Sequence, residues 1–172
     1  MSYCQYCRNL PSDNPHRRYH DEVYGRKISD DNELFGRLIL EMNQAGLSWD
    51  IILKREAHFR VAYDGYQIDA VARYNQADID RLMQNPGVIR NRLKIEAAIY
   101  NAKQILALKE GHGSFIDWIE GQQIKNKEEW VKVFKKNFKF VGQEIVNEFL
   151  LSIGEMEGSH ESDCPIFQQL NK

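Results

Sequence analysis

Apolar residues recur every three or four positions through most of the chain after residue 30, which is the spacing of one face of an α-helix. In segment 31–45, Leu34, Leu38 and Met42 follow this pattern, and Gly46 ends it. The capping candidates at its start are Ser29, Asp30 and Asp31. The same periodicity predicts further helices over residues 48–59, 68–74, 78–84, 89–109, 114–119, 127–136 and 143–153.

No segment alternates apolar and polar residues for long enough to form a convincing strand, so the predicted fold class is all-α. The two ends, residues 1–29 and 155–172, are polar and lack clear periodicity, and they contain all three cysteines and three of the five histidines. We therefore expect one domain over residues 1–172. It consists of a helical body at 30–154 and two irregular ends that fold against it.

The composition of the chain excludes several classes of protein. The chain has 172 residues, 42% of them hydrophobic and 28% charged, which excludes disordered and fibrous classes. The longest apolar runs are only a few residues and the first residues lack a signal core, so we expect a cytoplasmic monomer with no membrane partner. The net charge of −2 lacks the overall basic balance of a typical nucleic-acid-binding domain. A nucleic-acid partner must therefore be recognised by local residues.

Metal-ligand residues stand near both ends of the chain. Cys4 and His20 lie near the N-terminus, and His160 and Cys164 form a His-x3-Cys pair near the C-terminus. A set of two cysteines and two histidines suits tetrahedral zinc, which would join two ends that have little apolar content. Two alternatives remain open, because the halves are far apart in sequence and could be unrelated, and because Cys7 could replace one ligand.

Glu41 and Trp49 form a second candidate site. On the predicted helix, Glu41 stands in line with Leu34 and Leu38 on the face that turns toward the core, where a carboxylate is costly unless paired or used. Trp49 begins the next helix, so an aromatic face and a carboxylate can form a pocket for a cationic ring. The alternatives are an edge position for Glu41 and a core position for Trp49.

A basic turn lies between two predicted helices at residues 85–94. Asn85, Pro86 and Gly87 favour a tight hairpin whose amides, at the start of a long helix, can receive a phosphate. Arg90, Arg92 and Lys94 add positive charge in the next turn. Such a hairpin can grip a DNA backbone without reading its sequence, although a solvated basic loop has the same pattern.

Taken together, the motifs resemble the DNA-3-methyladenine glycosylase I family over nearly the full chain. The specific signals are Gln-Ala-Gly-Leu-Ser-Trp at 44–49 and the split cysteine and histidine set. The remaining matches are Tyr19-His20-Asp21, Gly25, Leu34-Phe35, Glu41, Ile89-Arg90-x-Arg92-x-Lys94-Ile95 and Phe138-Lys139-Phe140-Val141-Gly142.

The resemblance implies a helix–hairpin–helix glycosylase with zinc held by Cys4, His20, His160 and Cys164. Its activity would be hydrolysis of the N-glycosidic bond of 3-methyladenine in alkylated double-stranded DNA, after the base is flipped out of the stack. By family position, Glu41 is the catalytic residue, and the base contacts are Tyr19, Trp49, Tyr24 and Tyr6. The DNA contacts expected with it are Asn85, Pro86, Gly87, Arg90, Arg92, Lys94, Gly46 and Leu47.

Two features refine that expectation. No lysine occupies a nucleophile position in the hairpin, so we predict no lyase step, and the product is free 3-methyladenine. The family usually has Trp where this chain has Tyr24, and Trp is common where it has Tyr6. The alternative function is therefore a divergent, catalytically weak member that binds DNA or a nucleobase.

Overall fold

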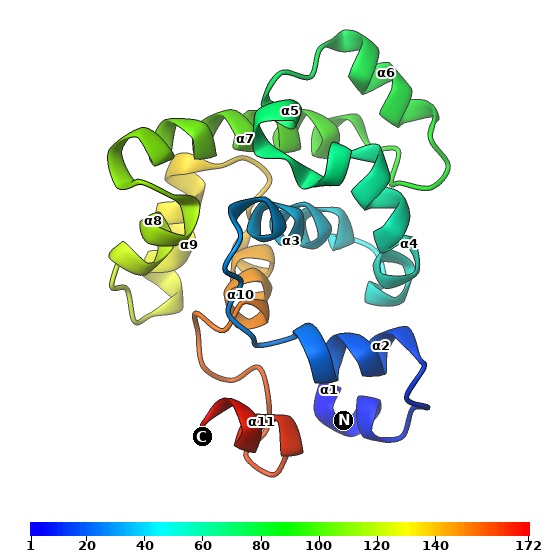
Figure 1. Cartoon of the computed structure of the whole chain (residues 1–172), viewed down its shortest axis with the longest axis vertical. Helices are drawn as coiled ribbons and strands as arrows, with labels where there is room; N and C mark the ends of the chain where they lie inside the picture. The colour runs from blue at the N-terminus through cyan, green and yellow to red at the C-terminus, as the bar shows by residue number, and fades with distance from the viewer.

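The chain folds into α-helices joined by short turns, and the all-α prediction is confirmed (Figure 1). The structure is a computed structural model that describes residues 1–172. None of its helices is both long and apolar enough to cross a membrane. The α-helices are α1 (Tyr3–Arg8), α2 (Pro15–Arg18), α3 (Asp31–Gln44), α4 (Trp49–Ala62), α5 (Ile68–Ala72), α6 (Gln76–Gln84), α7 (Arg92–His112), α8 (Phe115–Gly121), α9 (Lys127–Asn137), α10 (Gln143–Ser152) and α11 (Pro165–Leu170).

The helix boundaries follow from capping side chains. Asp30 accepts a hydrogen bond from the Glu33 amide at 2.9 Å and starts α3 where the sequence predicted. The long helix α7 begins three residues later than its predicted start at Ile89. Its cap is Asn91, whose side chain accepts from the Lys94 amide at 3.1 Å. The basic residue Arg90 therefore lies in the turn before the helix.

Helix α3 lies in the middle of the body, between α7 and α10 (Figure 1). Its side chains Phe35, Leu38 and Ile39 are fully buried in the main apolar core, to which α4, α5, α8 and α9 also contribute. Gly36 allows close packing, because a Cβ there would lie 2.3 Å from the Tyr66 ring. The central helix is therefore rigidly held, and it is the helix that carries Glu41.

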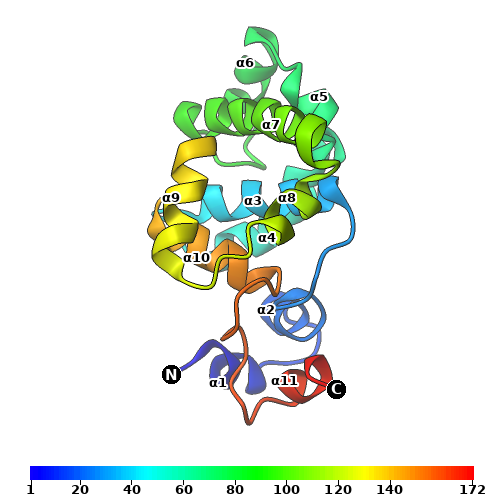
Figure 2. The ribbon, with the colours of Figure 1, turned by 90° about the vertical axis from the view of Figure 1, so that its left-hand side faces the viewer.

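The two ends of the chain lie together below the body, with α1 next to α11 (Figure 2). The expectation that these ends are irregular is wrong, because they contain α1, α2, a π-helical turn at Tyr19–Val23 and α11. These elements are too short for apolar periodicity to reveal them, but they carry local start signals. Ser2 forms a capping box with Gln5, and Pro15 and Pro165 occupy the first positions of α2 and α11.

Candidate functional site

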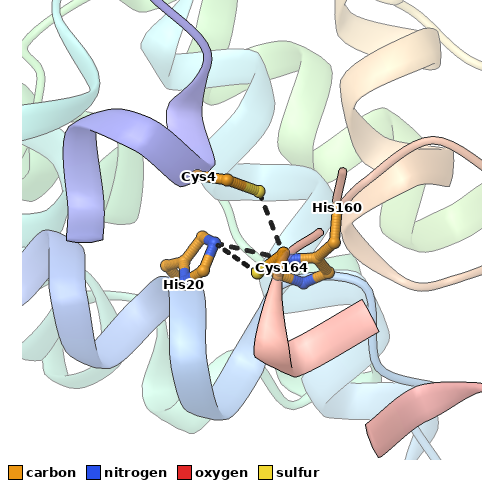
Figure 3. A group of neighbouring side chains, drawn as sticks. All are labelled: Cys4, His20, His160 and Cys164. Carbon is orange, nitrogen blue, oxygen red and sulfur yellow. Dashed lines mark hydrogen bonds between the residues drawn. The ribbon is translucent and has the colours of Figure 1, made fainter. Parts of the chain in front are cut away.

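Four side chains from the two ends of the chain converge on one point (Figure 3). Cys4, His20, His160 and Cys164 are buried, and their ligand atoms all lie within 4.8 Å of one another. His160 Nδ1 is 3.2 Å from His20 Nε2, 3.7 Å from Cys4 Sγ and 3.8 Å from Cys164 Sγ. Bonds of about 2.0 to 2.3 Å to a tetrahedral ion place ligand atoms about 3.3 to 3.8 Å apart. The cluster can therefore hold a metal ion.

Neighbouring groups orient both histidines toward that point. The Asp21 carboxylate lies 2.6 Å from His20 Nδ1, so this nitrogen carries the proton and Nε2 is free to bind a metal. Arg17 in turn donates to Asp21 at 2.6 Å. On the other histidine, Nε2 donates to the Tyr24 carbonyl at 2.8 Å, which leaves Nδ1 facing the cluster. The protonation pattern is that of metal-ligating imidazoles.

Cys7 is not part of this cluster. Its side chain is fully buried, and its Sγ donates to the His16 carbonyl at 3.6 Å. The structure thus separates the two cysteines of the Cys4-x2-Cys7 spacing, and it brings together the four residues that lie at opposite ends of the sequence.

A cavity of about 280 Å³ lies beside the metal cluster and is lined by aromatic and acidic residues. Its lining residues are Tyr3, Tyr19, Tyr24, Glu41, Gln44, Trp49 and Glu148. No lysine, arginine or histidine is among them. Aromatic faces and carboxylates without a competing cation suit a flat, positively charged ring.

Glu41 is directed into the interior, as its position on the helix predicted, and not toward solvent at an edge. Only 4% of the residue is exposed, and it lines the cavity one turn before the end of α3. Burial raises its pKa to about 8, which the positive charge of Arg37 opposes and the negative charge of Glu148 reinforces. The carboxyl is therefore poised to gain from a cation brought into the cavity.

Three aromatic side chains form adjoining walls. The ring of Trp49 meets that of Tyr19 edge-on at 5.2 Å between centroids, and the ring of Tyr24 is 5.6 Å from Tyr19. Tyr19 is fixed from behind, because Arg37 donates to its hydroxyl at 3.0 Å. Trp49 is partly buried and starts α4 after a turn in which Gly46 has φ +79°. After that turn, Trp49 lines the cavity and also packs against the edge of the main core.

Tyr6, predicted as a base contact, is not among the residues that line this cavity. Tyr6 is 42% exposed on α1, where it stacks on Tyr3, and Tyr3 is the residue of α1 that lines the cavity. One helical turn separates the two positions, and the short α1 gave no periodic signal that could have distinguished them. Glu148 was also missed, because it lies on α10, far along the sequence from Glu41 and Trp49, and none of the matching motifs includes it.

The predicted hairpin is a turn between α6 and α7. The Asn85 side chain accepts from the Gly87 amide at 2.8 Å, and Gly87 packs so closely on α4 that a Cβ would lie 2.9 Å from that of His58. Pro86, Arg90 and Arg92 are exposed, and so is Gly46 in the preceding α3–α4 turn, while Leu47 is half-buried. The turn and the first residue of α7 thus each present one arginine to solvent.

Lys94 does not belong to this exposed set, and its prediction as a direct DNA contact is corrected. The residue is 4% exposed, and its Nζ donates to the carbonyls of Asn43 and Ala45, both at 2.8 Å. The last turn of α3 contains no basic residue, and the carbonyls at its end have no partner within the helix. The Lys94 amine supplies the missing hydrogen bonds and a positive charge there. Lys94 therefore ties the start of α7 to the end of the helix that carries Glu41.

Comparisons with known proteins identify relatives of this chain. Residues 9–137 match the family model described as methyladenine glycosylase. DNA-3-methyladenine glycosylase of Haemophilus influenzae is 33% identical over 86% of this chain and 89% of that protein. DNA-3-methyladenine glycosylase 1 of Escherichia coli is 31% identical over 85% of this chain and 88% of that protein.

The fold agrees with these sequence matches. A solved structure of 3-methyladenine DNA glycosylase I from Staphylococcus aureus, from work on how that enzyme recognises 3-methyladenine, superposes with a TM-score of 0.83 at 30% identity. The match covers 96% of this chain and 97% of the other. Because the sequence matches and the shared fold agree, the chain belongs to the methyladenine glycosylase family.

Proposed function

We propose that this protein is a DNA glycosylase that removes 3-methyladenine from alkylated DNA. The observation that carries the proposal is the cavity in which buried Glu41 faces aromatic walls with no positively charged side chain among them. Methylation at N3 gives the adenine a positive charge while it is attached to the sugar. A neutral base lacks the charge that this cavity is built to receive.

The residues that line the cavity have different roles in base binding and hydrolysis. The base enters the cavity after it is flipped out of the duplex, with Trp49 as the stacking face. Tyr19 and Glu41 meet its edge, and the bond from Arg37 fixes the Tyr19 hydroxyl. Because the methylated base is already a good leaving group, strong acid assistance is unnecessary. Ionised Glu41 stabilises positive charge that develops on the sugar, and water completes hydrolysis of the N-glycosidic bond.

The expected absence of a lyase step agrees with the position of Lys94. A lyase needs a lysine amine that can reach the sugar carbon. Lys94, the lysine nearest the hairpin turn, is buried and donates to two backbone carbonyls. We therefore propose a monofunctional enzyme that leaves an abasic site.

We propose that zinc occupies the cluster of Cys4, His20, His160 and Cys164. Two cysteines and two histidines, all buried and with their ligand atoms within 4.8 Å of one another, suit a structural zinc ion. When bound, the ion joins the two ends of the chain. Through the bond from His160 to the Tyr24 carbonyl, the cluster also fixes one wall of the cavity. One zinc per chain by elemental analysis supports this assignment, and full metal retention by Cys164→Ser contradicts it.

The proposed partner is alkylated double-stranded DNA, bound by a monomer in the cytoplasm. Arg90 in the α6–α7 turn and Arg92 at the start of α7 contact phosphates, together with the exposed backbone around Pro86 and Gly46 and the adjoining Leu47. Lys94 holds these two turns at a fixed separation through its bonds to Asn43 and Ala45. The proposed DNA contact is therefore confined to these two turns and the adjoining start of α7, so it does not require an overall positive charge and is consistent with the net charge of −2.

Release of free 3-methyladenine from methylated duplex DNA tests the proposal. We expect time-dependent release by the wild-type protein and a loss of at least about a hundredfold in the Glu41→Ala/Trp49→Ala double variant. Binding to abasic-site DNA without release above that of the double variant would refute the enzymatic function and favour a binding protein.

A further inference from the structure

Glu148 brings a second carboxylate to the cavity from a helix that supplied none of the predicted site residues. It lies on α10, which packs against α3, and it lines the cavity together with Glu41. Unlike Glu41, it is exposed to solvent, and no lysine, arginine or histidine forms an ion pair with it. The negative charge of Glu148 is therefore free to act on whatever occupies the cavity.

Several groups in the cavity respond to the charge of Glu148. It raises the pKa of Glu41, and it contributes to the raised pKa values of Tyr24 and Tyr19. Partial desolvation at the cavity raises the pKa of Glu148 itself, while the neighbouring Tyr24 hydroxyl and the charge of Lys127 on α9 oppose that rise. The carboxyl therefore lies near Tyr24 in the lining of the cavity.

Glu41 and Glu148 repel each other when both are ionised, and this repulsion contributes to the raised pKa of Glu41 in the absence of a ligand. A cation bound among the aromatic walls relieves that repulsion and gains attraction from both charges. A neutral base of the same shape gains neither. The difference in binding between charged and neutral bases therefore grows with the second carboxylate, whereas stacking on Trp49 is the same for both.

We propose that Glu148 is a specificity-determining residue that, with Glu41, selects positively charged alkylated purines over neutral bases. This inference rests on the proposed function, because it takes the cavity to be the base pocket. The ligand class is a purine carrying a fixed positive charge. Glu41 supplies the buried charge next to the reacting bond, and Glu148 supplies a second charge at the solvent side.

Calorimetric binding of two small probes tests this role without the chemical step. The probes are the 3,9-dimethyladeninium cation, which keeps its charge at every working pH, and neutral 9-methyladenine. We expect Glu148→Gln to reduce affinity for the cation about fivefold and to leave affinity for the neutral probe unchanged. Glu144→Gln is the matched control, because Glu144 is an exposed carboxylate one turn earlier on α10 that does not line the cavity. Glu148→Asp should retain the preference for the cation.

The outcomes separate this inference from the proposed function. If Glu148→Gln weakens both probes equally, or neither, Glu148 does not determine specificity. If the wild type prefers the cation and Glu41→Gln abolishes that preference while Glu148→Gln does not, the base pocket stands and only the role of Glu148 is overturned. If the wild type binds neither probe, the proposed base pocket and the role of Glu148 both fail.

Discussion

Replacing Glu41 by Gln is expected to stabilise the fold while it impairs base release. The carboxyl is buried among aromatic walls, and its pKa rises from 4.5 to about 8 on folding. A raised carboxyl pKa means that the folded protein binds a proton that the unfolded chain releases, so the group costs stability as pH rises from the unfolded pKa toward the folded one. Gln keeps the shape and removes the charge.

The magnitude follows from the pKa of the two states. With a Glu41 pKa of 4.5 in the unfolded chain and about 8 in the folded protein, the carboxyl lowers the free energy of unfolding by less than about 1 kcal/mol at pH 5. At pH 7 it lowers it by about 3 kcal/mol. The free energy of unfolding of Glu41→Gln should therefore exceed that of the wild type by an amount that grows by about 2.5 kcal/mol over this interval. Comparison at the same pH cancels the titration of the metal ligands, which both proteins share.

Urea unfolding followed by circular dichroism at both pH values, with zinc present throughout, measures this difference. Glu144→Gln is a suitable control, because its carboxylate is exposed and its replacement should leave the difference between the two pH values unchanged. A stability difference between Glu41→Gln and the wild type that is the same at pH 5 and pH 7 would refute the argument from burial. So would a variant that is less stable than the wild type at pH 7.

Three further predictions test groups around the cavity. Arg37→Met removes the charge that favours ionised Glu41, so the acidic limb of the pH profile of base release should move up by about one pH unit, as measured in single turnovers. Lys94→Met leaves two buried carbonyls without their donor and should lower the free energy of unfolding by about 2 kcal/mol in urea. Arg90→Ala and Arg92→Ala should each weaken binding to every duplex alike and reduce the slope of log affinity against log salt by about 1 in fluorescence titrations.

Matched variants serve as controls for these three. Arg37→Lys keeps the charge, so a shift equal to that of Arg37→Met would show that charge is not the cause. Lys103→Met alters an exposed lysine on the same helix as Lys94, and an equal loss of stability in both would contradict the buried role. Arg73→Ala removes an exposed arginine away from the hairpin, and a salt slope reduced as much as by Arg90→Ala would exclude a local contact.

Much of the helical body was predictable because its helices are long and amphipathic. The spacing of Leu34, Leu38 and Glu41 placed the carboxylate on the inner face of its helix, and the structure buries it there. The ends were less predictable. Elements of four to six residues, such as α2 and α11, carry too few apolar positions for periodicity, and their start signals are single capping residues.

Within the site, residues grouped in one sequence block were easier to predict than residues brought together by the fold. Trp49 and Glu41 lie eight positions apart and line the same cavity. Glu148 reaches that cavity only because α10 packs on α3, which no local pattern reports. Lys94 was misplaced for a related reason: its positive charge suggested an exposed phosphate contact, but the unpaired carbonyls that draw it inward belong to a different helix.

The position of bound 3-methyladenine tests the central claim most directly. A crystal structure of the complex should show the base in the cavity of Glu41, stacked on Trp49 with its edge on Tyr19 and Glu41. A larger cavity of about 600 Å³, lined by Arg18, Arg37 and Glu33 among others, lies on the other side of Tyr19 and offers an alternative place. A base found there, or outside both cavities, would contradict the assignment of the aromatic and acidic cavity as the base pocket.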